Sequence, residues 1–227
     1  PSAPMPAPEF PRDAKKAVAL QRQLAGLVQL APLARLPELV AGVDCAIAPG
    51  GEEIVGVAVL MRFASGEVVE EQVARRPLTF PYVPGLLSFR EGPVLLAALA
   101  ALTQRPELLL CDGQGIAHPR RFGIASHLGV LLDLPSVGIG KSRLCGEERV
   151  VGERRGDWEP LMDKGICIGS ILRTRERVRP VYVSPGHRCD QAGARAVVLA
   201  WGRGHRLPEP VHLADRLSKR RRVAPSP

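Results

Sequence analysis

Cysteine and aromatic residues are scarce in this sequence of 227 residues. The five cysteines are widely spaced and form no C-x-x-C pair, so the sequence predicts neither a disulfide framework nor a zinc site. We expect them to be reduced and packed as small core residues. Phe, Trp and Tyr together make up 4% of the chain, which argues against the extended base-stacking platform of a single-strand-binding protein.

Long hydrophobic runs are also missing. No apolar run approaches the roughly 20 residues that a membrane-spanning helix needs, and no charged-then-apolar leader opens the chain. We therefore expect a soluble, cytoplasmic protein without membrane contacts. Hydrophobic residues still amount to 45%, enough for one good core, and we expect one domain that acts as a monomer.

Acidic residues are outnumbered by basic ones. The 31 Lys and Arg residues against 23 Asp and Glu residues give a formal net charge of +8, which favours a polyanionic partner such as nucleic acid or an acidic membrane face. One basic run lies at 216–222, where the charges are either solvated or in contact with phosphate groups.

Composition divides the chain into three parts. Residues 1–12 are rich in proline and predict a flexible N-terminal arm. Residues 13–217 predict a single domain that carries the chemistry, and residues 218–227 predict a basic, flexible tail.

Hydrophobic periodicity predicts an α/β fold. Helices are expected at 13–28, 92–102, about 122–132 and about 190–201, and strands at 39–47, 53–63, 67–76, 108–111, 136–139, 166–173 and 178–184. Short turns that contain glycine separate the first three strands and indicate an antiparallel meander. Ser88 and Glu91 match the S-x-x-E capping box at the start of the second helix. This order predicts a mixed sheet flanked by helices, as in the ribonuclease-H-like class.

Three carboxylates occupy positions that suit a cation site. Asp44 and Asp112 follow apolar runs of predicted strands, and Glu91 stands at a predicted helix start. If the two strands are parallel neighbours, Asp44 and Asp112 lie side by side at the carboxyl edge of the sheet. Each Asp alone could be a turn or capping residue, and Glu91 could serve the capping box, although its helical face points toward the sheet. Together, carboxylate oxygens suit Mg²⁺ or Mn²⁺ better than zinc.

Several long motifs give the sequence a more specific resemblance. They are AGVD at 41–44, PYVPGLLSFRE at 81–91, DGQGIAHPRRFG at 112–123, GIGKSRLCG at 138–146 and LPEP at 207–210. In this order they resemble the motifs of the endonuclease V family, the deoxyinosine 3′ endonucleases, and the match spans about 14–217. The resemblance implies a ribonuclease-H-like, Mg²⁺- or Mn²⁺-dependent enzyme that cuts DNA at the second phosphodiester bond 3′ to deoxyinosine and leaves 5′-phosphate ends. Inosine-containing RNA is the alternative substrate, because no sequence feature measures tolerance of a 2′-hydroxyl group.

The resemblance also implies roles for particular residues. The residues that correspond to catalytic groups are Asp44, Glu91, Asp112, His118, Lys141 and Asp215. The first three correspond to metal-binding carboxylates, and His118 and Lys141 to groups near the scissile phosphate. Asp215 stands where family members have His or Asp, which makes it a candidate fourth group near the metal. The segment around Lys141 is not a P-loop, because Pro135 stands where that motif requires glycine.

The same motifs predict how a damaged base is recognised. Tyr82 lies between Pro81 and Pro84, whose fixed φ angles stiffen the loop. Its ring could be a wedge that fills the gap left by an extruded base, or it could pack on its own loop. By resemblance, the base pocket consists of Leu87, Gly113, Gln114, Gly115, Ile124 and Leu144, and phosphates contact Arg120 and Arg121, which could instead be solvated. A non-catalytic nucleic-acid-binding protein that relies on charge and Tyr82 is the remaining alternative.

Overall fold

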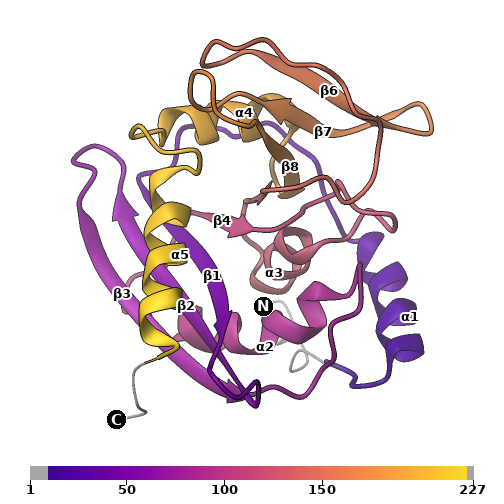
Figure 1. Ribbon diagram of the computed structural model, residues 1–227, viewed down its shortest axis with the longest axis vertical. Coiled ribbons are helices and arrows are strands. Elements are labelled where there is room, and N and C mark those ends of the chain that lie inside the picture. Colours follow the sequence, from indigo (N-terminus) through magenta and orange to yellow (C-terminus); the bar gives the residue numbers. More distant parts are fainter. Residues whose placement is uncertain (1–9, 224–227) are drawn as a thin grey trace.

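The computed structural model describes residues 10–223 and has one sheet at its centre (Figure 1). Its strands are β1 (Leu39–Ile47), β2 (Glu53–Arg62), β3 (Val68–Pro77), β4 (Leu108–Asp112), β5 (Ser136–Gly140), β6 (Trp158–Asp163), β7 (Ile166–Leu172) and β8 (Val181–His187). Its helices are α1 (Ala14–Ala25), α2 (Leu87–Ala100), α3 (Ile124–Leu132), α4 (Gln191–Ala200) and α5 (Glu209–Arg221). The strand order is β3-β2-β1-β4-β5-β8-β7-β6. The predicted mixed sheet flanked by helices is confirmed.

The first three strands form the predicted antiparallel meander. β1 pairs with β2, and β2 pairs with β3. The turn between β1 and β2 contains Gly50 and Gly51, with φ angles of 95° and 78°, and the turn before β3 contains Gly66, with φ of 68°. Glycine adopts these positive φ angles without steric cost, so the chain reverses where these glycines occur.

The parallel strands β1, β4 and β5 form the middle of the sheet. Side chains of β4 alternate between the two faces: Leu108 and Leu110 pack with α4 and α5, whereas Leu109 and Cys111 pack with α2 and α3. Both faces are therefore covered, which explains why β4 is apolar throughout rather than alternating with polar residues. Asp112 continues the alternation and lies on the face that α5 covers.

Helix α2 begins earlier than the sequence predicts. Leu86, which has no polar side chain, is its N-cap, so the predicted capping box of Ser88 and Glu91 was wrong. The Oγ atom of Ser88 lies 3.0 Å from Nδ1 of His127 instead, and both residues are buried. Phe89 is also buried. Packing of this first turn against α3 therefore outweighs the local capping signal.

Two elements, β6 and α5, were not predicted. Helix α5 runs to Arg221, so the predicted flexible tail from residue 218 was wrong for residues 218–221. Val211, Ala214 and Leu217 form an apolar face of α5 that packs on the sheet. This face holds the basic segment in place, and residues 224–227 lie outside the described part of the chain.

The N-terminal boundary also shifts. Residues 1–9 lie outside the described part, but Phe10 packs against Phe89 and His127 at ring-centroid distances of 6.2 and 5.1 Å. The assignment of Phe10 to a flexible arm was therefore wrong, because this apolar ring is half-buried among other rings. Within residues 10–223, no helix has the length and apolar character needed to span a bilayer.

Candidate metal centre

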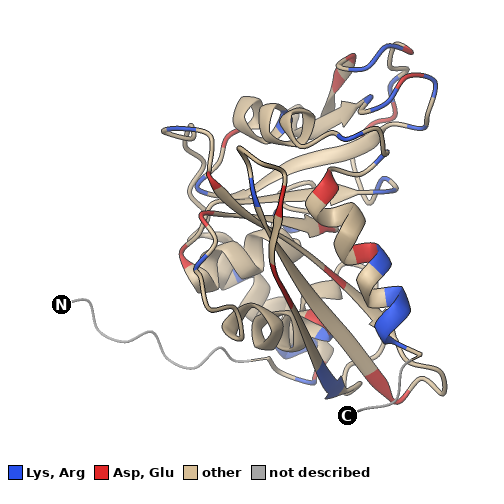
Figure 2. Cartoon of the chain, turned by 90° about the vertical axis from the view of Figure 1, so that its left-hand side faces the viewer, with Lys and Arg blue, Asp and Glu red and all other residues tan. Residues whose placement is uncertain are grey.

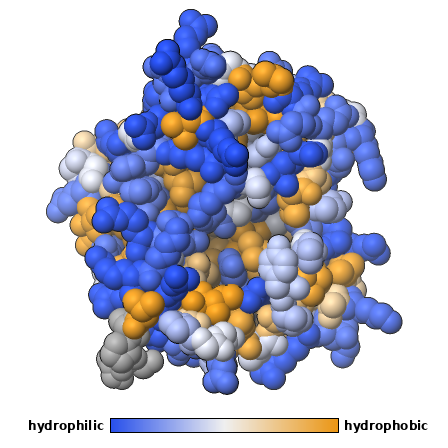
Figure 3. All heavy atoms as spheres, viewed as in Figure 1, coloured by the Kyte–Doolittle hydropathy of each residue, from blue (hydrophilic) through white to orange (hydrophobic). Residues whose placement is uncertain are grey.

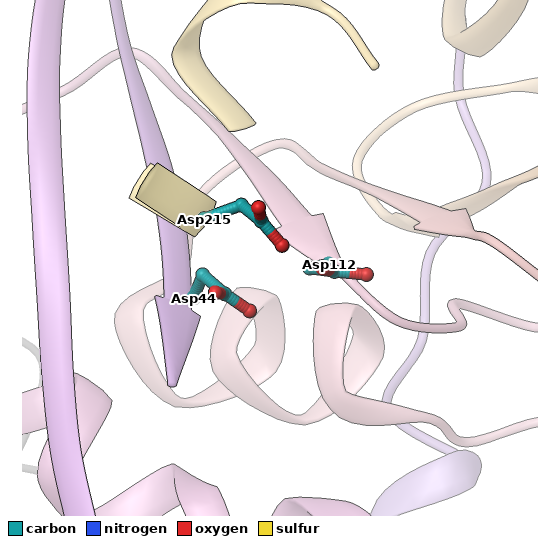
Figure 4. A group of neighbouring side chains, drawn as sticks. All are labelled: Asp44, Asp112 and Asp215. Carbon is teal, nitrogen blue, oxygen red and sulfur yellow. The ribbon is translucent and has the colours of Figure 1, made fainter. Parts of the chain in front are cut away.

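Two aspartates lie side by side because their strands are parallel neighbours. β1 pairs with β4 in a register that places Val43 beside Cys111, so the next residues, Asp44 and Asp112, are adjacent on the same face of the sheet. Helix α5 crosses this face and contributes Asp215 (Figure 4). One carboxylate oxygen from each of the three lies within 4.8 Å of the other two. The predicted pairing of Asp44 with Asp112 is confirmed, and Asp215 joins them.

A glycine allows α5 to approach the sheet closely. A Cβ atom added at Gly42 would lie 2.1 Å from the carbonyl oxygen of Pro210, at the first turn of α5. Only a residue without a side chain fits there, since the neighbouring atoms belong to the backbone. This close contact brings the later turns of α5 over Asp44.

Ser218 orients one of the carboxylates, a contact that no sequence pattern predicts. Its hydroxyl group donates a hydrogen bond of 2.7 Å to Oδ2 of Asp44 and lies 3.0 Å from the carbonyl oxygen of Asp215. Ser218 is fully buried on the face of α5 that packs against β1. The predicted flexible tail concealed this contact, because only a helix brings residue 218 to the sheet.

Glu91 approaches the same centre from the other side of the sheet. It lies on α2, half-buried, and lines the cavity that contains Asp44 and Asp112. Burial raises the pKa of Glu91, and the negative charges of Asp44 and Asp112 raise it as well, so that it reaches about 8. Glu91 is therefore close enough to interact with the pair, but it is outside the cluster of three aspartates.

The carboxylates destabilise one another when they are all charged. Burial raises the pKa of Asp44 to about 7, and the neighbouring Asp112 adds to this effect, whereas the hydrogen bond from Ser218 opposes it. A cation relieves this repulsion, and the donor atoms are all carboxylate oxygens. Such a donor set fits hard ions such as Mg²⁺ or Mn²⁺ and lacks the His or Cys ligands that zinc prefers.

Lys141 already provides one positive charge at this centre. It follows β5, and its ammonium group forms ion pairs with Asp112 and, at 2.7 Å, with Oδ1 of Asp215. Burial alone would lower the pKa of Lys141, but the two carboxylates raise it above its usual value. Lys219 contacts the other oxygen of Asp215 at 2.6 Å. The prediction that Lys141 lies at the active centre agrees with this placement.

A cavity of about 590 Å³ extends from the carboxylates. Figure 3 shows apolar residues gathered in the middle of this face, with hydrophilic residues around them. Five of the six predicted base-pocket residues line the cavity: Leu87, Gly113, Gln114, Ile124 and Leu144. Gly115 does not, because it is buried against β8, where an added Cβ would lie 2.2 Å from the carbonyl oxygen of Pro185. A role of Gly115 in base recognition stays a prediction.

The side chain of Gln114 connects two loops of the cavity wall. Its Nε2 atom donates to the carbonyl oxygen of Ser142 at 3.0 Å, which joins the loop after β4 to the loop after β5. Among the residues that the structure describes, its buried Oε1 atom has no hydrogen-bond partner. A buried acceptor without a partner is energetically costly.

Tyr82 lies at the edge of the cavity. Its side chain is 69% exposed, and the guanidinium group of Arg90 lies 5.7 Å from the ring centroid. The ring does not pack into its own loop, which was the alternative that the sequence left open. An exposed, rigid ring beside an apolar cavity is suited to insertion between bases.

The predicted residues His118, Arg120 and Arg121 have partners within the protein. His118 is buried, which lowers its pKa to about 4, and Nε2 lies 2.9 Å from the carbonyl oxygen of Gly85. Arg120 donates to the same oxygen at 2.9 Å. Arg121 forms an ion pair of 2.6 Å with Asp163. Phosphate contact at the two arginines remains a prediction, and both guanidinium groups already bind acceptors of the protein.

Comparison with known proteins identifies relatives over most of the chain. The family model described as Endonuclease V matches residues 22–216. An endonuclease V of Azotobacter vinelandii is 50% identical over 202 residues, which cover 89% of this chain and 91% of that protein.

Solved structures of the same family share the fold. The endonuclease V of Streptomyces avermitilis is 43% identical, with a TM-score of 0.88 over 93% of this chain and 94% of that chain. The endonuclease V of Ciona intestinalis, solved with a 24mer DNA containing an inosine followed by a ribo-adenosine, is 24% identical, with a TM-score of 0.79 over 91% of this chain and 96% of that chain. The predicted ribonuclease-H-like α/β fold is thereby confirmed.

Proposed function

The chain belongs to the endonuclease V family, and from this membership we propose that it is a divalent-metal-dependent endonuclease specific for deoxyinosine in DNA. The expected cut is at the second phosphodiester bond on the 3′ side of the lesion, with a 5′-phosphate on the downstream fragment. One observation carries the proposal: Asp44, Asp112 and Asp215 converge within 4.8 Å at one end of the cavity that Tyr82 borders.

The metal would be held by Asp44, Asp112 and Asp215, with Glu91 next to them. When bound, Mg²⁺ or Mn²⁺ supplies Lewis acidity, which lowers the pKa of a water molecule and neutralises charge on a phosphate. Ser218 orients Asp44 for this role through its hydrogen bond.

Lys141 supplies the charge that the scissile phosphate needs. Because its pKa is raised, it keeps its proton at neutral pH and can donate hydrogen bonds to a phosphate oxygen. Lys141 is paired with Asp112 and Asp215 in this structure. It would leave these carboxylates and pair with the phosphate when the carboxylates hold the metal. His118, with a pKa of about 4, is neutral at the same pH.

The cavity suits a flipped purine with a ring N–H. Leu87, Ile124 and Leu144 offer apolar surface to the base. Gln114 lines the cavity, and a turn of its side chain would expose the Oε1 acceptor to inosine, which presents an N–H group where adenine presents an acceptor nitrogen. A site with an unsatisfied acceptor therefore favours inosine over adenine. The Ciona protein that was crystallised with inosine-containing DNA supports this assignment by its shared fold.

An end-labelled oligonucleotide assay tests the proposal. Duplexes with one deoxyinosine or with adenine at the same place are incubated with Mg²⁺, Mn²⁺ or a chelator, and the break is mapped to a nucleotide. We expect metal-dependent cleavage one nucleotide beyond the lesion, and Asp44→Ala and Asp112→Ala should abolish it. The exposed Glu176→Ala is the matched control. Cleavage by both aspartate variants at the parent rate would refute the site, and matched RNA strands decide between deoxyinosine and the alternative RNA substrate.

A further inference from the structure

The carbonyl oxygen of Gly85 accepts hydrogen bonds from three side chains. His118 Nε2 lies 2.9 Å away, Arg120 Nη2 lies 2.9 Å away and Gln21 Nε2 lies 3.0 Å away. The donors belong to separate parts of the chain, since Gln21 is on α1 and the other two follow β4. We call Gly85 and these three side chains the Gly85 clasp.

Gln21 is the least expected member of the clasp. It is 1% exposed on a helix whose other side chains, apart from Ala17, reach solvent. Its Nε2 atom also donates to the carbonyl oxygen of Phe122 at 2.7 Å, and its Oε1 atom accepts from Nε of Arg120. The amide thus uses both donor hydrogens and its acceptor, which offsets the cost of burying it.

The hydrogen bonds of His118 define its tautomer. Nδ1 lies 3.0 Å from the backbone N–H of Arg120, so it accepts, and Nε2 must carry the proton that Gly85 accepts. Both ring nitrogens are occupied by backbone groups. His118 therefore acts on the loop of Gly85 and does not itself point a free nitrogen at a substrate.

Gly85 connects Tyr82 to α2. It has a φ angle of 80°, which strongly favours glycine, and an added Cβ would lie 2.8 Å from Nη2 of Arg120. Two residues later α2 begins, and six residues after Gly85 stands Glu91. Fixing this carbonyl group therefore fixes the loop 81–86 between the exposed ring and the helix that carries Glu91.

We propose that Gln21 is a positioning residue, which acts with His118 and Arg120 through the Gly85 carbonyl group to hold the Tyr82 loop at the edge of the cavity. The consequence for lesion recognition rests on the proposed function, whereas the effect on the loop does not. A loop held in place before binding loses less entropy when its ring enters the duplex.

Hydrogen–deuterium exchange tests the clasp without any assay of activity. Gln21→Leu removes the donors and the acceptor at nearly constant volume, and Gln23→Leu is the matched control, because Gln23 is exposed on the same helix. We expect the amide of Leu86, which donates to the carbonyl oxygen of Val83 at 2.9 Å, to exchange about tenfold faster in Gln21→Leu, as for the loss of about one hydrogen bond, with strand β4 unchanged. Unchanged exchange in the loop would overturn the proposal.

A second variant covers the case in which Gln21→Leu does not fold. Arg120→Met removes one donor to Gly85 and the bond to Gln21 and should also accelerate exchange of the Leu86 amide. If a folded Arg120→Met protein shows the parent pattern, the proposal is wrong.

A binding experiment separates positioning from general damage. In the presence of Ca²⁺, Gln21→Leu should lose about tenfold of its preference for inosine over undamaged duplex, while Mn²⁺ affinity at the aspartates stays at the parent value. Full preference with a loosened loop would reject the role in recognition. If the parent protein itself shows no inosine preference, the proposed function fails, and the exchange experiment still decides whether the clasp exists.

Discussion

At the scale of single residues, the carboxylates of the metal centre are held in position by neighbouring side chains. Ser218 holds Asp44, Lys141 contacts Asp112 and Asp215, and Lys219 contacts Asp215. Because Ser218, Lys141 and Lys219 are not themselves among the three aspartates, substituting one of them changes the orientation of the carboxylates and leaves all three in place.

Ser218→Ala is predicted to weaken metal binding. The hydrogen bond from Ser218 orients Asp44 and lowers the pKa of its carboxyl group, and the substitution removes this bond. Mn²⁺ affinity should therefore fall by about 10- to 100-fold, as for other losses of ligand orientation. Isothermal titration with Mn²⁺ measures this. Ser65→Ala, at an exposed turn, should bind Mn²⁺ as the parent does, and an unchanged affinity in Ser218→Ala would show that Asp44 needs no such support.

Metal affinity is predicted to rise with pH. In the metal-free protein Asp44 has a pKa of about 7 and Glu91 of about 8, so both hold protons below these values. A cation must displace the protons, and affinity should increase up to about pH 8 and then level off. Titrations in two buffers of different ionisation enthalpy report the protons released. A constant affinity from about pH 6 to pH 8 would contradict these pKa values.

The same shifts predict the stability of the metal-free protein. A carboxyl group whose folded-state pKa is raised contributes stability at low pH and loses it as pH rises through that pKa. With chelator present, the melting temperature should fall as pH rises from about 6.5 to about 8, a range in which the buried His118 and His127 are mainly neutral whether the protein is folded or unfolded, and saturating Mg²⁺ should restore more stability at the upper end. Thermal unfolding at several pH values measures both. A melting temperature that increases with pH in chelator would mean that neighbouring positive charges already compensate the charged carboxylates.

At the scale of elements, the close contact of α5 with β1 builds the centre. Gly42→Ala is predicted to destabilise the protein by about 1–3 kcal/mol, as for overpacking elsewhere, because the new methyl group would meet the backbone of Pro210. It should also weaken Mn²⁺ binding, since Asp215 lies on the displaced helix. Gly26→Ala is the control, because an added Cβ there meets only the carbonyl oxygen of Gln23, at 3.5 Å. Denaturant unfolding gives both values, and equal stability of the two variants would argue against the contact.

The sequence predicted the elements whose pattern is local and missed those that depend on tertiary contacts. The apolar runs that end at Asp44 and Asp112 predict that two strands carry the aspartates, and the structure shows that these strands are parallel neighbours. The start of α2 was misplaced because Ser88 pairs with His127, far along the chain. Helix α5 was not predicted because the basic residues of its last turns mask the apolar periodicity of the face that packs on the sheet. The contact of Gln21 with Gly85 was not predicted because no sequence motif marks it.

At the scale of the whole molecule, positive charge is not evenly spread. Figure 2 shows Lys and Arg gathered at the C-terminal end of α5, where the last turn contains Lys219, Arg220 and Arg221. Cations at this end also stabilise the helix dipole. Lys219 and Arg222 line the cavity with the aspartates, so this end of α5 is positioned to contact the backbone of the nucleic acid.

Arg222→Ala and Tyr82→Ala are predicted to affect binding in different ways. Arg222→Ala should weaken binding to damaged and undamaged duplex equally and reduce the slope of log K against log salt by about 1, since a phosphate contact is lost. Tyr82→Ala should reduce the preference for inosine and leave the salt slope unchanged, since the ring carries no charge. Fluorescence anisotropy over a range of salt concentrations separates these outcomes. Equal loss on both duplexes in Tyr82→Ala would contradict its role as a wedge.

The convergence of three aspartates on a divalent cation is tested most directly by anomalous diffraction from a crystal soaked in Mn²⁺. We expect one or more manganese peaks in contact with oxygens of Asp44, Asp112 and Asp215, with the ammonium group of Lys141 moved away from these carboxylates. Crystals in which manganese binds elsewhere, while Lys141 stays paired with Asp112 and Asp215, would contradict it.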